Sequence, residues 1–212
     1  MNELLDLILH TDDALLALVG ENVYKAYIVL FLVIMLETGL ILFPFLPGDG
    51  LLFSAGVICA TTEMEVTVLL VLLPFAATFG NLMNYHTGQA MEVQFRKRSG
   101  SLIVKYLIKH LPKAEEFYGK HGARAIIIGR FFPILRTYVP FVAGMIGMER
   151  KIFLKYSALG ALIWISLFLL AGFYLGEITW VKNNYGLIFL LLIIITLIPF
   201  FTALILRLFK RK

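Results

Sequence analysis

The chain is 212 residues long, and 60% of its residues are hydrophobic while only 16% are charged. Soluble domains average about 45–50% apolar and about 25% charged residues, so this composition excludes an ordinary soluble protein and predicts an integral membrane protein. The formal net charge is +5, and the lone Cys59 excludes an internal disulfide. At about 20 residues per spanning helix, the length allows one compact membrane unit and little more.

The N-terminal residues 1–21 are acidic and lack the basic start of a secretory signal, so we expect no cleavable signal peptide. Apolar residues recur in this segment at helical spacing, namely Leu4, Leu5, Ile8, Leu15, Leu16 and Val19. This pattern predicts an amphipathic helix that lies along the membrane surface over 1–21 and does not span.

An apolar stretch over 27–60 is interrupted near its middle. Glu37 is the carboxylate in its first half, and Asp49 follows the interruption. The residues expected to break the helix between them are Pro44, Pro47 and Gly48. The remaining run to residue 60 is too short to cross about 30 Å of hydrocarbon at about 1.5 Å per residue. We therefore predict a re-entrant hairpin over 27–60, made of two half-helices.

A full span is predicted over 66–90, and its second half is unusually polar. The polar residues that could line a cavity there are Asn81, Asn84 and His86. For His86, a structural hydrogen bond is the alternative. The basic stretch that follows, 91–124, is expected in the cytoplasm under the positive-inside rule.

A second interrupted segment, 125–147, contains Arg130 and Arg136. Basic residues on both sides of it are expected in the cytoplasm, so the segment must enter the membrane and return, with its turn and helix breaks at Pro133 and Pro140. Further full spans are predicted over 153–175 and 187–206, followed by a basic cytoplasmic tail. Trp164 lies in the middle of a span and is expected to pack in the core.

These elements predict an all-α integral membrane fold. It consists of two opposed re-entrant helical hairpins in an inverted repeat and about three full transmembrane helices. The two hairpins would bring two acids and two arginines together near mid-membrane. Charges at that depth are costly, which favours a functional site over a plain anchor.

The sequence also resembles a known family. Glu37-Thr38-Gly39, the run from Pro44 to Asp49 and the run from Gly129 to Met148 are similar to the signature of the DedA family, which is related to the SNARE-associated Golgi proteins and the VTT-domain superfamily. The resemblance covers about residues 15–180. Together with the predicted elements, it divides the chain into the surface helix 1–21, a DedA-like membrane transport domain over 22–180, and a C-terminal helix with its tail over 181–212. Asn81 departs from the pattern, because many members carry an acid there.

The resemblance implies a flippase-like or scramblase-like transporter of a lipid such as undecaprenyl phosphate or phosphatidylethanolamine. It implies a place in the bacterial cytoplasmic membrane, with the C-terminus in the cytoplasm, and coupling to the proton motive force. The family's essential acids match Glu37 and Asp49, and its essential arginines match Arg130 and Arg136. The implied partners are a phospholipid or polyprenyl phosphate and protons, with no cofactor, metal or nucleic acid; a homodimer is compatible with the sequence.

The chemistry of these residue types agrees with that function. Guanidinium groups bind phosphate oxygens in fork geometry, and the N-termini of half-helices offer further N–H donors. Burial disfavours a carboxylate's charge and a nearby Arg favours it, so Glu37 and Asp49 could exchange protons when a phosphate takes the arginine. Two structural alternatives remain: Asp49 as a helix N-cap, and an ion pair that only holds the hairpins together.

Three other function classes compete with lipid transport. We expect no enzyme, because the sequence has no catalytic residue set and no zinc-protease motif. A non-transporting scaffold that supports envelope homeostasis would use the charges only for packing. A proton-coupled carrier of small cations or drugs would use the acids to bind its substrate.

Overall fold

The computed structural model describes residues 11–40, 48–95, 118–176 and 178. Within these residues every regular element is a helix, as predicted. The chain divides into two compact units. The first unit contains 1–33, 45–73 and 163–212, and the second contains 34–44 and 74–162. Three helices, α3 (Val23–Gly39), α5 (Val66–Phe95) and α9 (Arg150–Gly176), contribute residues to both units.

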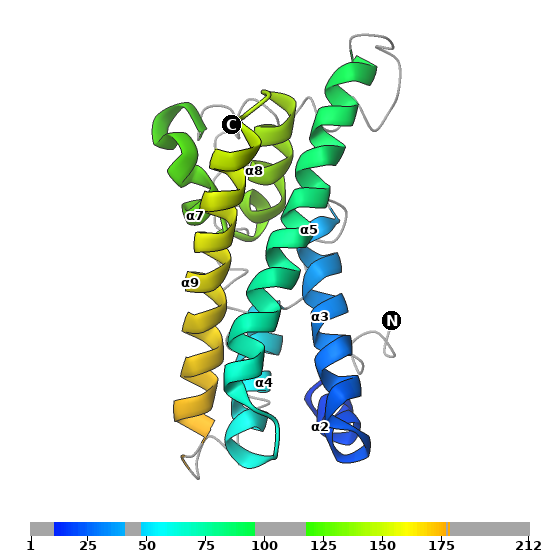
Figure 1. Ribbon diagram of the computed structural model, residues 1–212. Helices are drawn as coiled ribbons and strands as arrows, with labels where there is room; N and C mark the ends of the chain where they lie inside the picture. Colours follow the sequence, from blue (N-terminus) through cyan, green and yellow to red (C-terminus); the bar gives the residue numbers. More distant parts are fainter. Residues whose placement is uncertain (1–10, 41–47, 96–117, 177, 179–212) are drawn as a thin grey trace, which may run out of the picture. The chain divides into compact units, whose positions relative to one another are not determined.

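The first unit is built around α4 (Gly48–Thr61), which packs against α2 (Thr11–Glu21). Nearly all of α4 is buried, because its residues are apolar or small on every face. The Asn22 side chain caps the start of α3 by accepting hydrogen bonds from the N–H groups of Tyr24 and Lys25. Figure 1 shows α4 and α2 at the blue and cyan end of the colour scale.

The backbones of α4 and α9 touch where glycines remove the side chains. A Cβ atom at Gly56 would lie 2.1 Å from the carbonyl oxygen of Leu169, and one at Gly172 would lie 2.0 Å from that of Phe53. Small residues allow such close approach between membrane helices, where van der Waals packing drives association. This contact therefore depends on glycine on both helices.

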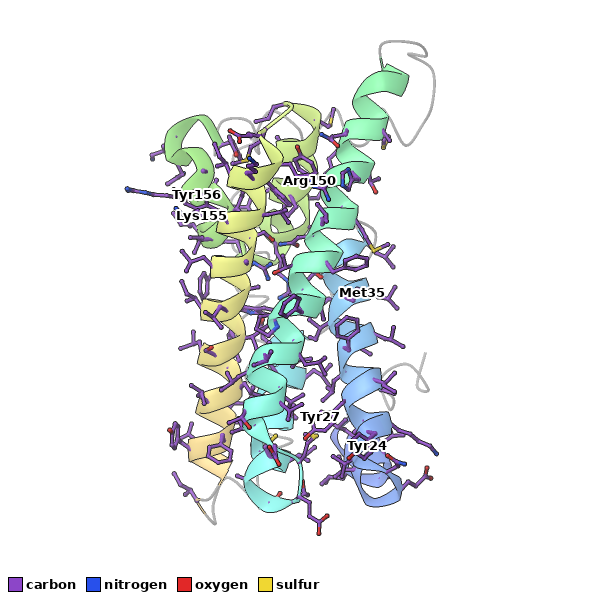
Figure 2. The ribbon with its side chains drawn as sticks, viewed as in Figure 1. Tyr24, Tyr27, Met35, Arg150, Lys155 and Tyr156 are labelled. Atoms are coloured by element: carbon purple, nitrogen blue, oxygen red, sulfur yellow. The ribbon has the colours of Figure 1, made fainter. Side chains whose placement is uncertain are left out.

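The second unit contains α7 (Ala125–Gly129), α8 (Pro133–Met145), the end of α3, the second part of α5 and the start of α9. A short 3-10 turn, η1 (Gly122–Arg124), leads into α7, and α7 packs against α8. Figure 1 shows α7 and α8 as two consecutive short helices. Figure 2 places Arg150 and Lys155 on the first turns of α9, where both side chains are exposed.

Glycines also bring helices of the second unit together. A Cβ at Gly88 of α5 would lie 2.1 Å from the Phe141 carbonyl oxygen of α8, and one at Gly144 would lie 2.0 Å from that of Tyr85. Between α5 and α3, a Cβ at Gly80 would lie 2.3 Å from the carbonyl oxygen of Met35, a residue labelled on α3 in Figure 2. The backbone of α5 thus approaches the backbones of both α3 and α8 closely.

The second interrupted segment differs from the prediction in where it turns. The turn lies at residues 130–132, between α7 and α8, and not between Pro133 and Pro140. Pro133 begins α8, where a missing N–H costs nothing. Pro140 lies inside α8, so it does not break the helix; it cannot donate to the Arg136 carbonyl, but the buried packing of Phe141 and its neighbours holds the helix together.

In the first interrupted segment, α3 ends at Gly39 and α4 begins at Gly48. The interruption predicted there is therefore present, while Pro44 and Pro47 lie outside the described residues. The helix predicted over 66–90 continues to Phe95 as α5.

Two described helices, Val66–Met91 and Arg150–Gly176, are long and apolar enough to cross a membrane. They correspond to the spans predicted over 66–90 and 153–175. The third predicted span, 187–206, lies outside the described residues, as do 1–10 of the surface helix and 96–117 of the basic loop.

A tyrosine cluster holds the start of α9 beside α5 within the second unit. The hydroxyl of Tyr85 donates to the carbonyl of Met148, and that of Tyr118 donates to the Met148 sulfur. Burial, with a smaller contribution from Tyr85, raises the pKa of Tyr118 to about 12. The Tyr118 phenol therefore stays protonated, and remains a donor, at every physiological pH.

Candidate functional site

The second unit buries three of the four charged residues that the sequence singled out. Glu37 near the end of α3, Arg130 in the turn after α7 and Arg136 in α8 are 3%, 3% and 8% exposed. Asp49, in the first turn of α4, is partly buried and belongs to the first unit. Charged groups at such depth need partners, so the contacts of each one decide what it can do.

Glu37 and Arg136 form a buried ion pair. The Nη2 atom of Arg136 donates a hydrogen bond to Oε1 of Glu37, across 99 residues of sequence. The prediction that an acid of the first interrupted segment meets an arginine of the second holds for these two residues. A pair of this kind compensates two charges that would each be very unfavourable alone.

Arg130 contacts α9. Its Nη2 atom donates to the carbonyl oxygen of Ser157 at 3.3 Å. Gly160, one turn further along α9, leaves room for the arginine, because a Cβ there would lie 3.2 Å from Cδ of Arg130. Among the described residues, the second unit therefore holds two buried guanidinium groups, one paired with a carboxylate and one bonded to a backbone carbonyl.

The polar half of α5 faces protein in the second unit. Asn81 donates to the Ser157 hydroxyl at 2.9 Å, and Asn84 donates to the Thr137 carbonyl at 2.7 Å. Both asparagines are at most 1% exposed, whereas His86 is exposed and its ring lies 3.0 Å from Oε1 of Gln89. Asn81 and Asn84 thus belong with the buried charges, and His86 does not.

In the first unit, Asp49 has a partner that the sequence did not predict. The indole N–H of Trp164 donates to Oδ1 of Asp49 at 2.7 Å, across 115 residues. Trp164 is completely buried, as its predicted packing role requires, but it also makes this hydrogen bond. The sequence alone could have indicated a hydrogen-bond partner for Trp164, because a buried tryptophan in a span usually needs an acceptor for its N–H.

Replacing Trp164 with phenylalanine should lower the free energy of unfolding by about 1.5–3 kcal/mol, the usual size of a hydrogen bond to a charged group. Phenylalanine keeps an aromatic ring but is smaller than the fully buried tryptophan, so a loss of packing adds to the loss of the donor to Asp49. Thermal unfolding in detergent measures the effect. Asp49→Asn keeps an acceptor oxygen for the indole and serves as the milder control. A Trp164→Phe protein as stable as the original would show that this bond contributes nothing.

Comparison with known proteins places the chain among membrane proteins. Residues 46–174 match the VTT domain. The chain is 40% identical to Protein DedA of Escherichia coli strain K12 over 198 residues, which cover 92% of this chain and 90% of that protein. No solved structure matches it.

Two further relatives have lower identity. An uncharacterized membrane protein of Mycobacterium tuberculosis strain H37Rv is 35% identical over 80% of this chain and 74% of its own length. The inner membrane protein YqjA of Escherichia coli strain K12 is 33% identical over 71% of this chain and 68% of its own length. The similarity therefore covers most of the described residues.

Proposed function

Since the chain belongs to the DedA family of membrane proteins, we propose that it moves a phosphate-bearing lipid across the bacterial cytoplasmic membrane. The lipid would be of the type of undecaprenyl phosphate or phosphatidylethanolamine. The observation that supports this most is the buried ion pair of Glu37 and Arg136. A guanidinium in fork geometry suits phosphate as well as carboxylate, so one anion can replace the other.

Charge balance links phosphate binding to a proton. The ion pair is neutral as a whole, and a singly charged lipid phosphate that takes Arg136 would leave Glu37 as an uncompensated buried carboxylate. That state is strongly unfavourable. Protonation of Glu37 removes the extra charge, so lipid and proton would enter the site together. We propose that the proton motive force drives transport through this exchange.

The other two charged residues have supporting roles in the proposal. Arg130, held by Ser157, would be a second phosphate-binding group. Asp49 would be a second proton-exchanging carboxylate, with Trp164 donating to it when it is ionised. A hydrogen bond to the charged form of an acid favours that form. As long as Trp164 donates to Asp49, it would therefore favour the ionised carboxylate over the protonated acid.

We also propose that each interrupted segment is a re-entrant hairpin. The helices α3 and α4 have 17 and 14 residues, or about 26 Å and 21 Å, and α7 and α8 are shorter still. Each is shorter than the roughly 30 Å of hydrocarbon that a full span must cross. In intact vesicles, an impermeant thiol reagent that reached Asn22→Cys and Glu63→Cys from opposite sides would rule out the first hairpin.

Reconstitution in lipid vesicles tests the function. Exchange of a labelled phosphate lipid between leaflets should be faster with the protein than without it, and a pH gradient of the correct sign should drive net movement. A protein that leaves exchange at the rate of empty vesicles, with and without a gradient, would refute the proposal. An enzyme would instead release product from the lipid phosphate in detergent, where no vesicle exists.

The competing classes predict different behaviour in the same vesicles. A carrier of small cations or drugs would move its substrate without added lipid phosphate, and lipid phosphate would not compete. A scaffold would move neither, and the ion pair would matter only for stability.

A further inference from the structure

Two buried oxygen atoms of the second unit, on α5 and α8, have no hydrogen-bond partner among the described residues. They are Oδ1 of Asn84 on α5 and Oγ1 of Thr137 on α8. The residues are 0% and 1% exposed, so the oxygens are fully removed from solvent. The Nδ2 atom of Asn84 donates to the Thr137 carbonyl at 2.7 Å, which requires that the other amide atom be the acceptor oxygen.

These oxygens lie in the same unit as the proposed phosphate-binding group. Thr137 directly follows Arg136 in α8, and Asn84 is tied to the backbone of Thr137. Buried polar atoms without partners cost free energy, and most proteins avoid them unless they have a function. Here the cationic guanidinium and the two oxygens come from one turn of α8 and the helix bonded to it.

We propose that Asn84 and Thr137 bind the N–H or O–H donors of a phospholipid headgroup whose phosphate is bound by Arg136. This inference rests on the proposed function and narrows it to one substrate class. An ethanolamine ammonium or a glycerol hydroxyl supplies the donors that the two oxygens need. A choline headgroup has the same charge as ethanolamine but no N–H, and a polyprenyl phosphate has no group beyond its phosphate.

A binding site with hydrogen-bonding groups discriminates against a ligand that lacks the matching group, because buried polar atoms are then left unpaired. Phosphatidylethanolamine and phosphatidylcholine, both labelled on the acyl chain, are therefore the decisive pair of probes in vesicles. We expect ethanolamine lipid to exchange at least about tenfold faster than choline lipid, which corresponds to one hydrogen bond.

Thr137→Val is the sharpest variant, since valine keeps the shape of threonine and loses only the hydroxyl that has no described partner. It should reduce exchange of the ethanolamine lipid about tenfold and leave that of the choline lipid unchanged. Its unfolding temperature should not fall, because an unpaired buried hydroxyl is removed. Thr87→Val on α5 is the control, because that side chain is exposed and its hydroxyl donates to Met83.

The possible outcomes distinguish a failure of this inference from a failure of the proposed lipid transport. Equal exchange of the two lipids, with Thr137→Val changing neither, would overturn the inference and leave lipid transport standing. No exchange of any phosphate lipid by the unmodified protein would overturn both. A phosphatidylglycerol probe then identifies the donor: exchange at the ethanolamine rate supports recognition of hydroxyl as well as ammonium, and exchange at the choline rate supports ammonium alone.

Discussion

Replacing Arg136 with alanine is expected to lower the free energy of unfolding by about 3–5 kcal/mol and to abolish lipid exchange. The reason is that Glu37, only 3% exposed, loses the guanidinium that donates to its Oε1 atom. Chemical or thermal unfolding in detergent measures the first effect, and vesicle exchange measures the second. Glu37→Gln should also stop proton-driven exchange, because an amide cannot take up the proton.

An exposed ion pair is the control for this prediction, because it shows whether the loss of stability comes from burial of the pair or from loss of any ion pair. Lys25 and Glu21 form an exposed pair at 3.4 Å, four residues apart in sequence. Lys25→Ala should change the free energy of unfolding by no more than about 0.5 kcal/mol, as exposed pairs of this spacing usually do.

Swapping the residues of the ion pair, Glu37 and Arg136, distinguishes a purely structural ion pair from a phosphate-binding site. The double variant with Glu37→Arg and Arg136→Glu keeps both charges in contact, so it should recover part of the stability lost in the single variants. Lipid exchange should remain absent, since the cation no longer lies on α8. If the double variant transports normally, or if Arg136→Ala does, the phosphate-binding role of Arg136 is wrong.

Replacing Gly88 with alanine should also lower the free energy of unfolding and slow lipid exchange. The new Cβ would lie 2.1 Å from the carbonyl oxygen of Phe141, a distance that real Cβ atoms essentially never show, so α5 and α8 would have to move apart. Overpacking of this kind typically costs about 1–3 kcal/mol, and a clash with backbone lies at the upper end. Because the helices that move include the one with Arg136, lipid exchange should fall as well.

Gly20→Ala is the control for the glycine prediction. Nothing lies within 4 Å of a Cβ at Gly20, which is also a helical glycine. Alanine there should stabilise the protein by about 0.5–1 kcal/mol through helix propensity. Unfolding of both variants in detergent checks the contrast, and equal stability of the two would mean that α5 and α8 do not pack as closely as described.

The local features of this chain were predictable from its sequence. Composition required a membrane protein, and the apolar runs predicted the helices now described as α5 and α9. Two prolines, which cannot donate to a helix, predicted that the helix would not run on to residue 60, and α3 ends at Gly39 while α4 begins at Gly48. Glu37 and Arg136 were recognisable as candidate functional residues, because each is a charged residue within an apolar segment.

Only the tertiary structure determined which side chains form the ion pair and the hydrogen bonds of the buried charged residues. Which arginine meets Glu37, and that Trp164 donates to Asp49, depends on how helices rotate and pack over separations of 99 and 115 residues. The exact turn at residues 130–132 was also not predictable, because Pro140 was expected to break a helix that buried packing in fact maintains. Local propensity acts over a few residues, whereas backbone contacts such as that of Gly88 with Phe141 set which faces of the helices meet.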